Sequence, residues 1–393
     1  FAFWLLLLIG EVASTGVHAV ASVCEGAGQR EGVGHAVVQG LWFSLISGLV
    51  AVGMLPLIRP YFNLVGIGHR ITVVESGASY LRGLIWGVLP LTASGVLVSG
   101  FKGVAELRPV LLVNVVCVAL NFVLDPLLIW GGGWIRPLGV AGAAFATNLC
   151  ALVATVLSFW LLNAQGVSLK LSPPEPSALL QIMRIGIPIS LGGILFTAIY
   201  IALGRLLSSM GGFYLAALGL GHKVEALAFT VCEGFGTAAA TIVGQWLGAN
   251  CEREARNAAA HAATVAAITT VPLVAVFLTF ARSLVAVFTQ DSSTIAAAVS
   301  YLHIVSLSFP FMAVELAMDG ALMAAGDSAP SFAAGLVFNV ARLPMSLWLG
   351  TRYGVHGVWA AITLSTVAKA VVKSVAFRRS RLPLLGKCSF ADV

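Results

Sequence analysis

The feature that most constrains this chain is a succession of long apolar segments that covers almost its whole length. Each segment reaches the about 20 residues that an α-helix needs to cross the roughly 30 Å hydrocarbon core of a bilayer. Membrane-spanning strands would instead alternate apolar and polar residues over about ten positions. We therefore predict an all-α polytopic membrane protein with eleven spans, at about 1–22, 36–58, 79–100, 109–130, 139–163, 183–207, 214–248, 258–281, 297–324, 331–350 and 355–377.

The composition excludes a soluble globular protein. Hydrophobic residues make up 59% of the 393 residues and charged residues only 10%, with a mean hydropathy of +0.97. Soluble domains carry about 25% charged residues. The net charge of +6 comes from Lys and Arg residues that are thinly spread and not interleaved with aromatic residues. We therefore expect the lipid bilayer as a partner and no nucleic acid.

The two halves of the chain repeat one another at a nearly constant offset of about 220 residues. The triplet Ser79–Leu81 recurs as Ser300–Leu302, and Glu11 matches Glu233. One offset that holds over several motifs indicates an internal duplication. The segment 183–207 has no counterpart in the first half. We therefore expect an intact protein of twelve helices, whose first helix this chain lacks.

Six helices per repeat give both repeats the same orientation, as in a parallel repeat about an axis along the membrane normal. The proline-rich connector at 173–176 is the natural joint between them. The predicted organisation is an N-terminal transmembrane lobe at 1–165 (helices 2–6), a cytoplasmic inter-lobe linker at 166–182, a C-terminal transmembrane lobe at 183–377 (helices 7–12) and a cytoplasmic basic tail at 378–393.

The distribution of basic residues predicts the orientation in the membrane. Twelve Lys and Arg residues fall in the loops on the side that carries the C-terminal tail, and six fall on the other side. Cytoplasmic loops carry the excess of positive charge. We therefore predict a multi-pass protein of the cytoplasmic (inner or plasma) membrane with its C-terminus in the cytoplasm.

Several motifs resemble those of a known transporter family. The second half contains Gly221–Phe229, Gly234–Ala249 and the loop Ala325–Pro330, and the first half contains Leu120–Leu128 and Leu138–Ala144. Together they resemble the signatures of the multidrug and toxin extrusion (MATE) family of cation-coupled antiporters. The resemblance covers essentially the whole chain. It implies two six-helix lobes around a central cleft, with drugs expelled in exchange for H⁺ or Na⁺.

The chain departs from the family pattern at three places. The first-half counterpart of the Ala325–Pro330 loop is Gly103–Pro109, a degraded match. The missing first helix is the one that carries a coupling aspartate in part of the family. The segment 183–207 lacks the glutamate that other members carry there. The family's coupling residues on those two helices therefore have no counterpart in this chain.

Coupling to a cation requires carboxylates in a low-dielectric cleft, where burial of a carboxylate raises its pKa and permits proton uptake. Five acidic residues within the spans are candidates. Glu225 is the first choice, and Glu11 and Glu233 form a pair related by the repeat. Glu315 and Asp319 lie four residues apart and so share one face of a helix.

Each of these carboxylates also has a structural interpretation. Glu225 could pair locally with Lys223 or His222, and Glu233 could have a hydrogen-bonded packing role. The pair that lies four residues apart could be neutralised by basic residues of neighbouring spans, such as Arg342 or Lys369. The sequence leaves both interpretations open.

Other candidates concern the substrate cleft and the turns. Flat organic cations bind aromatic faces through cation–π contacts, although most aromatic residues in a bundle simply pack. The cleft candidates are Tyr80, Phe196, Tyr200, Phe229 and Tyr301.

Three further acidic residues are predicted to be structural. Asp125 precedes Pro126 near the end of its span, and Glu106 and Asp327 lie at turns where a carboxylate caps the following helix.

The function predicted from these observations is secondary active export. The protein would antiport organic, cationic compounds against H⁺ or Na⁺ by alternating access, as a monomer without a cofactor. The alternative is a flippase for lipid-linked oligosaccharides or polyisoprenoids, which would need basic residues facing its cavity to hold pyrophosphate. The sequence contains no HExxH, GxSG or GxGD arrangement and no Walker A loop, so we expect no enzyme.

Overall fold

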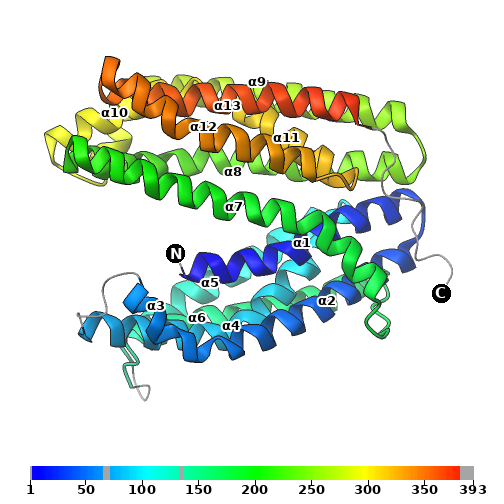
Figure 1. Cartoon of the computed structure of the whole chain (residues 1–393). Coiled ribbons are helices and arrows are strands. Elements are labelled where there is room, and N and C mark those ends of the chain that lie inside the picture. The colour runs from blue at the N-terminus through cyan, green and yellow to red at the C-terminus, as the bar shows by residue number, and fades with distance from the viewer. Residues whose placement is uncertain (1, 65–70, 133–135, 381–393) are drawn as a thin grey trace. The chain divides into compact units, whose positions relative to one another are not determined.

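The computed structural model in Figure 1 describes residues 2–64, 71–132 and 136–380. Contacts divide the chain into two units. Unit 1 runs from the N-terminus to Ser190, and unit 2 runs from Leu191 onward. The division falls inside one helix, α7, so that its first part belongs to unit 1 and its second part to unit 2.

All regular elements within the described ranges are helical. Unit 1 contains α1 (Ala2–Gly26), α2 (Arg30–Gly53), η1 (Leu55–Leu57), α3 (Ile58–Leu64), α4 (Ile71–Gly103), α5 (Leu107–Ile129), α6 (Val140–Ala164) and the start of α7 (Pro176–Met210). Unit 2 continues with α8 (Gly212–Gly248), α9 (Glu252–Ala286), α10 (Ser292–Ser306), α11 (Phe309–Ala324), α12 (Ala329–Tyr353) and α13 (Val355–Arg379).

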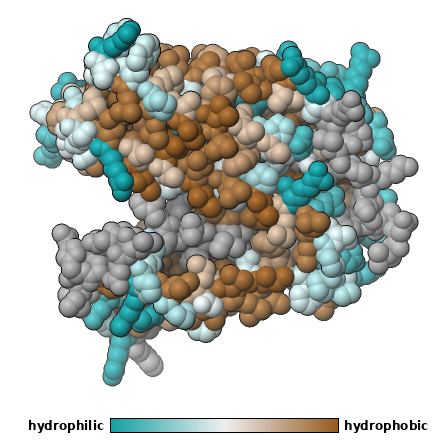
Figure 2. All heavy atoms as spheres, viewed as in Figure 1, coloured by the Kyte–Doolittle hydropathy of each residue, from teal (hydrophilic) through white to brown (hydrophobic). Residues whose placement is uncertain are grey.

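The structure confirms the all-α membrane architecture. Each predicted span coincides with one helix, except for one span that is broken into two helices. The short helix α3 was not predicted. Nine helices of the described ranges are long and apolar enough to cross a bilayer, or ten if the bent pair α10–α11 forms one span. On the face of unit 2 shown in Figure 2, apolar residues cover the middle of the surface and polar residues gather toward the helix ends.

The predicted continuous span 297–324 is wrong in one respect. It consists of α10 and α11, which are bent by 56° at a short break. Pro310 lies in the first turn of α11, where its missing N–H costs nothing, but a helix continuing through it would lose a hydrogen bond and clash with a carbonyl one turn earlier. The hydroxyl of Ser308 donates to the carbonyl of Val305 at 2.7 Å, which helps to close the break.

Four helix ends share one backbone turn, and they form two pairs that match the sequence repeat. Gly28 after α1 corresponds to Asn250 after α8, and Ala105 after α4 corresponds to Gly326 after α11. All four have left-handed φ, of 73°, 60°, 60° and 76°. In each turn the next N–H reaches back five residues to a carbonyl, as from Gln29 to Cys24, Cys251 to Trp246, Glu106 to Phe101 and Asp327 to Leu322. The duplication is therefore preserved in backbone geometry even where the residues differ.

These turns correct the predicted roles of Glu106 and Asp327. Glu106 lies at the N-cap of α5 but makes no side-chain capping hydrogen bond. Asp327 precedes Ser328, the N-cap of α12, which makes none either. Both acidic residues contribute their backbone N–H groups to the preceding turn.

A side-chain cap of the expected kind is found at Asp291 instead. Its carboxylate accepts from the N–H and the hydroxyl of Thr294 at the start of α10. The two hydrogen bonds lower the pKa of this carboxyl below its ordinary value. The contribution of the cap to stability is therefore present above the ordinary pKa of an aspartate and is lost as the pH falls through the lowered one.

The segment expected to link the lobes is held along α2 by hydrogen bonds. The amide of Gln39, which is fully buried, donates to the carbonyl of Pro173 at 2.9 Å and accepts from the N–H of Glu175 at 2.9 Å. The indole of Trp42 donates to the carbonyl of Ser172 at 2.8 Å. The first part of α7 then packs on α1, where a Cβ at Gly186 would lie 2.0 Å from the carbonyl oxygen of Val12.

The helices α8 and α11 cross at two glycines in unit 2. A Cβ added at Gly320 would lie 2.0 Å from the carbonyl oxygen of Gly236, and one at Gly236 would lie 2.8 Å from that of Leu316. Backbones can approach this closely only where side chains are absent, which is a common way to pack helices in lipid.

Replacement of Gly320 by Leu is expected to lower the stability of unit 2, because the new side chain meets backbone that cannot move aside. Overpacking of this kind typically costs about 1–3 kcal/mol. Thermal unfolding in detergent, followed by tryptophan fluorescence, measures the effect. Gly335→Leu is the matched control, since nothing lies within 4 Å of its added Cβ. Equal melting temperatures for the two variants would contradict the close crossing.

Candidate functional site

A cavity of about 440 Å³ lies in unit 2, and a larger one of about 920 Å³ lies in unit 1 among α1, α4, α5 and α6. The larger one is lined by carboxylate, amide and hydroxyl side chains as well as apolar ones. Its polar lining residues are Glu11, Ser14, Thr92, Ser94, Asn114, Asn121, Asp125 and Thr147. Neither Lys nor Arg occurs among the described residues that line it. The cavity therefore combines two carboxylates with amides and hydroxyls.

One face of α5 supplies the core of this site. Asn114, Asn121 and Asp125 are spaced by seven and four residues, so the 3.6-residue period of the helix places them on the same stripe. The amide nitrogen of Asn121 lies 3.9 Å from the sulfur of Cys150 on α6. This contact leaves its carbonyl oxygen available as a ligand.

Asp125 carries the most informative atom of the cavity. Its Oδ1 is buried and has no hydrogen-bond partner among the described residues. A buried acceptor without a partner costs about 1–3 kcal/mol, and more when it is charged. A proton or a cation bound at this oxygen would remove that cost. Carboxylate, amide and hydroxyl oxygens are also the ligands that hard cations prefer.

The structure thus changes the interpretation of two acidic residues. Asp125, predicted to be structural, lines the same cavity as Glu11. Glu11 was paired through the repeat with Glu233, which lies on α8 in unit 2, and both residues are exposed. The polar stripe of α5 was the available signal, since amides at this spacing are unusual in an apolar helix.

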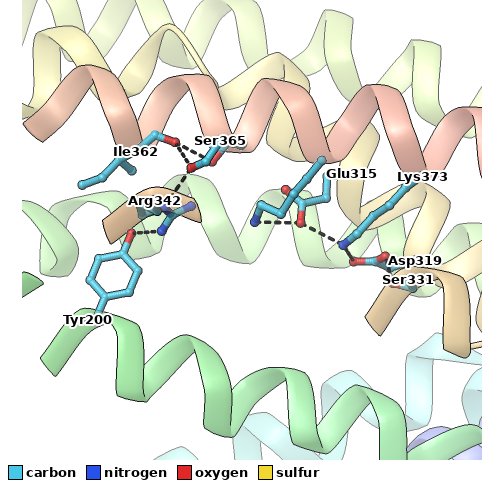
Figure 3. A network of polar contacts seen from close by, with 10 residues as sticks. Tyr200, Glu315, Asp319, Ser331, Arg342, Ile362, Ser365 and Lys373 are labelled. Atoms are coloured by element: carbon cyan, nitrogen blue, oxygen red, sulfur yellow. Dashed lines mark hydrogen bonds and ion pairs between the residues drawn. The ribbon is translucent and has the colours of Figure 1, made fainter. Parts of the chain in front are cut away.

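A second group of charges lies in unit 2 between α11 and α13 (Figure 3). Glu315 Oε1 is 2.9 Å from the Nζ atoms of both Lys369 and Lys373. Lys373 also donates to Asp319 at 2.7 Å, and the hydroxyl of Ser331 on α12 donates to the same carboxylate. The spacing of four residues on each helix aligns the two pairs face to face.

This group is charge-compensated. Two carboxylates face two ammonium groups, and the side chains of Glu315, Lys369 and Lys373 are at most 8% exposed. The arrangement matches the structural interpretation of Glu315 and Asp319. A free cation could bind there only by displacing a lysine.

Glu225 belongs to a third group. It accepts a hydrogen bond of 2.5 Å from the hydroxyl of Tyr301, which is fully buried. Neither Lys223 nor His222 makes an ion pair with Glu225 among the described residues. The hydrogen bond that Glu225 accepts thus comes from a tyrosine of α10.

Three of the five aromatic candidates belong to one series of ring contacts that includes His222. The ring centroids of Phe196 and Tyr200 are 4.4 Å apart, and those of Tyr200 and His222 are also 4.4 Å apart. The ring of Tyr301 stacks on His222 at 6.1 Å. The other two candidates lie elsewhere: Phe229 is 44% exposed on α8, and Tyr80 is on α4 in unit 1.

Arg342 contacts this aromatic group at Tyr200. It is 1% exposed and donates to the hydroxyl of Tyr200 at 3.1 Å and to Ser365 at 2.8 Å (Figure 3). Its guanidinium also lies 5.4 Å from the centre of the Tyr200 ring. One cation–π position of Tyr200 is therefore already taken by the protein itself.

Comparison with known proteins gives a consistent result. The MatE family model matches residues 1–127 and 188–348. The chain is 24% identical to the probable multidrug resistance protein NorM of Thermotoga maritima over 385 residues, which covers 95% of this chain and 82% of the relative. It is 23% identical to the multidrug resistance protein PmpM of Pseudomonas aeruginosa, covering 95% and 81% of the two chains.

Solved structures give the same result for the fold. The structure of the outward-facing conformation of a multidrug resistance MATE family transporter is similar with a TM-score of 0.87. The match covers 96% of this chain and 85% of that chain, at 23% identity. A crystal structure of a MATE protein in the straight conformation also has a TM-score of 0.87, at 22% identity.

Proposed function

The chain belongs to the MatE family of multidrug and toxin extrusion transporters, and we propose that it exports organic compounds in exchange for H⁺ or Na⁺. The names of its relatives support drug export, since NorM and PmpM are both called multidrug resistance proteins. Transport without chemical conversion of the substrate needs no cofactor. Alternating access would move the substrate by shifting the population between two conformations.

The observation that carries the coupling proposal is the unpartnered Oδ1 of Asp125 in the acidic cavity of unit 1. In the proposed cycle this oxygen takes up a proton or ligates Na⁺, with the oxygens of Asn121 and Thr147 as further ligands. Glu11 supplies the second negative charge of the cavity. Neutralising these charges would favour one of the two conformations, because a ligand shifts an equilibrium only by its difference in affinity.

The charge of the same cavity supports cationic substrates. Asp125 lines it with a buried carboxylate oxygen that has no hydrogen-bond partner among the described residues, so a cationic compound would be attracted and would compete with the coupling ion. The charges of unit 2 give no such preference, since Glu315 and Asp319 are paired with lysines. A flippase for pyrophosphate lipids would require basic residues in the cavity, where this chain has acidic ones.

The proposed topology follows the basic residues of the loops and tail. We place the protein in the cytoplasmic membrane, with the C-terminal end of α13 and its Arg378 and Arg379 on the cytoplasmic side. We expect it to act as a monomer.

Ethidium efflux from proteoliposomes tests the proposal. The chain is reconstituted, and efflux is followed by fluorescence under an imposed proton gradient, an imposed sodium gradient, or neither. We expect efflux well above that of empty liposomes under one of the gradients and not without a gradient. Gradient-independent efflux would indicate a channel, and no efflux under any gradient would contradict the proposed exporter.

A further inference from the structure

A second cavity, in unit 2, has a different character from the coupling site. It has a volume of about 440 Å³ and lies among α9, α11 and α13. Its walls are Ala260, Ala263, Thr264, Ala267, Ile268, Val314, Met318, Ser374 and Phe377, and two arginines, Arg256 and Arg378, complete the lining. It is thus an apolar cavity with positive charge.

The positive charge lies at one end because of the helix register. On α9 the lining runs from Arg256 to Ala260, Ala263 and Ala267, a stripe that starts in the second turn and continues toward the middle of the helix. On α13 the lining ends at Arg378, the penultimate residue of the helix. The cavity therefore extends from the charged helix ends along the apolar part of the bundle.

The two arginines lack acidic partners among the described residues. Arg256 donates to the carbonyls of Phe377 at 3.2 Å and Arg378 at 3.1 Å, and to that of Ser380 at 2.8 Å. These bonds hold its guanidinium at the C-terminal end of α13. Glu252 lies one turn before Arg256 on α9, but the two side chains form no ion pair within the described part of the chain. The guanidinium of Arg378 is exposed.

The apolar walls are exposed within unit 2. Ile268 is 64% exposed, and its neighbours Val265 and Val271 on α9 are 51% and 56% exposed. The hydroxyls of Thr264 and Ser374 donate to carbonyls of their own helices at 2.8 and 2.7 Å, so they present no free donor to the cavity. A ligand in this cavity would contact apolar side chains along its length and the two arginines at one end.

We infer that this cavity binds one anionic phospholipid, with the phosphate at Arg256 and Arg378 and an acyl chain along the alanine stripe of α9. Charge and hydrophobicity are both complementary to such a lipid. Basic pockets at the cytoplasmic ends of membrane helices suit acidic headgroups, and each basic residue near the surface contributes about a fivefold gain in affinity. The inference is independent of the exporter proposal, because lipid binding requires no transport.

Lipid binding is measured on the full chain in nanodiscs of phosphatidylcholine alone or with 20 mole per cent phosphatidylglycerol. Native mass spectrometry after release counts retained lipids, and thermal unfolding reports their effect on stability. We expect one phosphatidylglycerol to be retained preferentially and to raise the melting temperature. Inorganic phosphate, added alone, should not reproduce the shift, because it cannot occupy the apolar walls.

Two variants probe the two ends of the cavity. Arg378→Gln should weaken retention about fivefold, by removing one of the two arginine charges, and Ala260→Trp should weaken it by filling the apolar part. The matched controls are Arg379→Gln, the adjacent exposed arginine outside the lining, and Val265→Trp, an exposed position outside it. Equal retention of both lipids, or equal losses in variants and controls, would overturn the inference.

Discussion

Replacement of Asp125 by Asn is expected to abolish most gradient-driven efflux while leaving the protein folded. The amide has nearly the shape of the carboxylate but cannot take up a proton, and it is a weaker ligand for Na⁺. We expect the gradient-dependent rate to fall by about 5- to 150-fold, the range of ordinary coupling free energies. Ethidium efflux from proteoliposomes measures the loss, and the melting temperature in detergent reports whether the fold is retained.

Two further variants test where the coupling site lies. Glu106→Gln makes the same change at an exposed residue without a side-chain cap, and it should transport like the wild type. Glu225→Gln changes the carboxylate that is bonded to Tyr301. Normal coupling in Asp125→Asn, together with its loss in Glu225→Gln, would move the coupling site to unit 2.

Replacement of Lys373 by Met is expected to be the most destabilising of the changes considered for unit 2. Lys373 is 5% exposed and contacts both Glu315 and Asp319, so its removal leaves Asp319 without a counter-ion and leaves Lys369 as the remaining partner of the buried Glu315. Breaking a buried ion pair from one side typically costs about 3–5 kcal/mol. Thermal and chemical unfolding in detergent, followed by fluorescence, measure the change in free energy.

A surface ion pair provides the control for this experiment. Lys170 pairs with Glu31 at 3.0 Å, but the two side chains are 76% and 84% exposed, so Lys170→Met should cost under about 1 kcal/mol. The double variant Lys373→Met with Asp319→Asn should regain part of the loss, because it restores charge balance. A loss for Lys373→Met no larger than that of the control would mean that the network is not desolvated.

The positions of the spans were predictable because bilayer-length hydrophobicity is a local property of the sequence. The break between α10 and α11 was not predictable in this way. Proline occurs at Pro310, where the span breaks, but also at Pro90, Pro188 and Pro272 inside continuous helices. The surrounding packing decides whether a proline bends, ends or is tolerated in a helix, and the sequence of one segment does not contain that packing.

The partners of the charged residues were only partly predictable. Lys369 was named as a partner for the carboxylates of α11, and it does contact Glu315. Arg342 was named with it, yet it bonds Tyr200 and Ser365 instead. Which basic residue meets which acid depends on the rotation of each helix about its axis. That rotation is set by the whole bundle rather than by the spacing along one helix.

The shared helix α7 has a consequence for biosynthesis. The second sequence repeat begins within α7, yet unit 1 includes the chain as far as Ser190 and packs Gly186 against Val12. When α6 has left the ribosome, the first unit therefore still lacks a structural component, which arrives only with the opening helix of the next repeat. Co-translational assembly of the first unit must wait for that helix, and a polypeptide divided within 166–175 would leave its N-terminal fragment unable to complete its own packing.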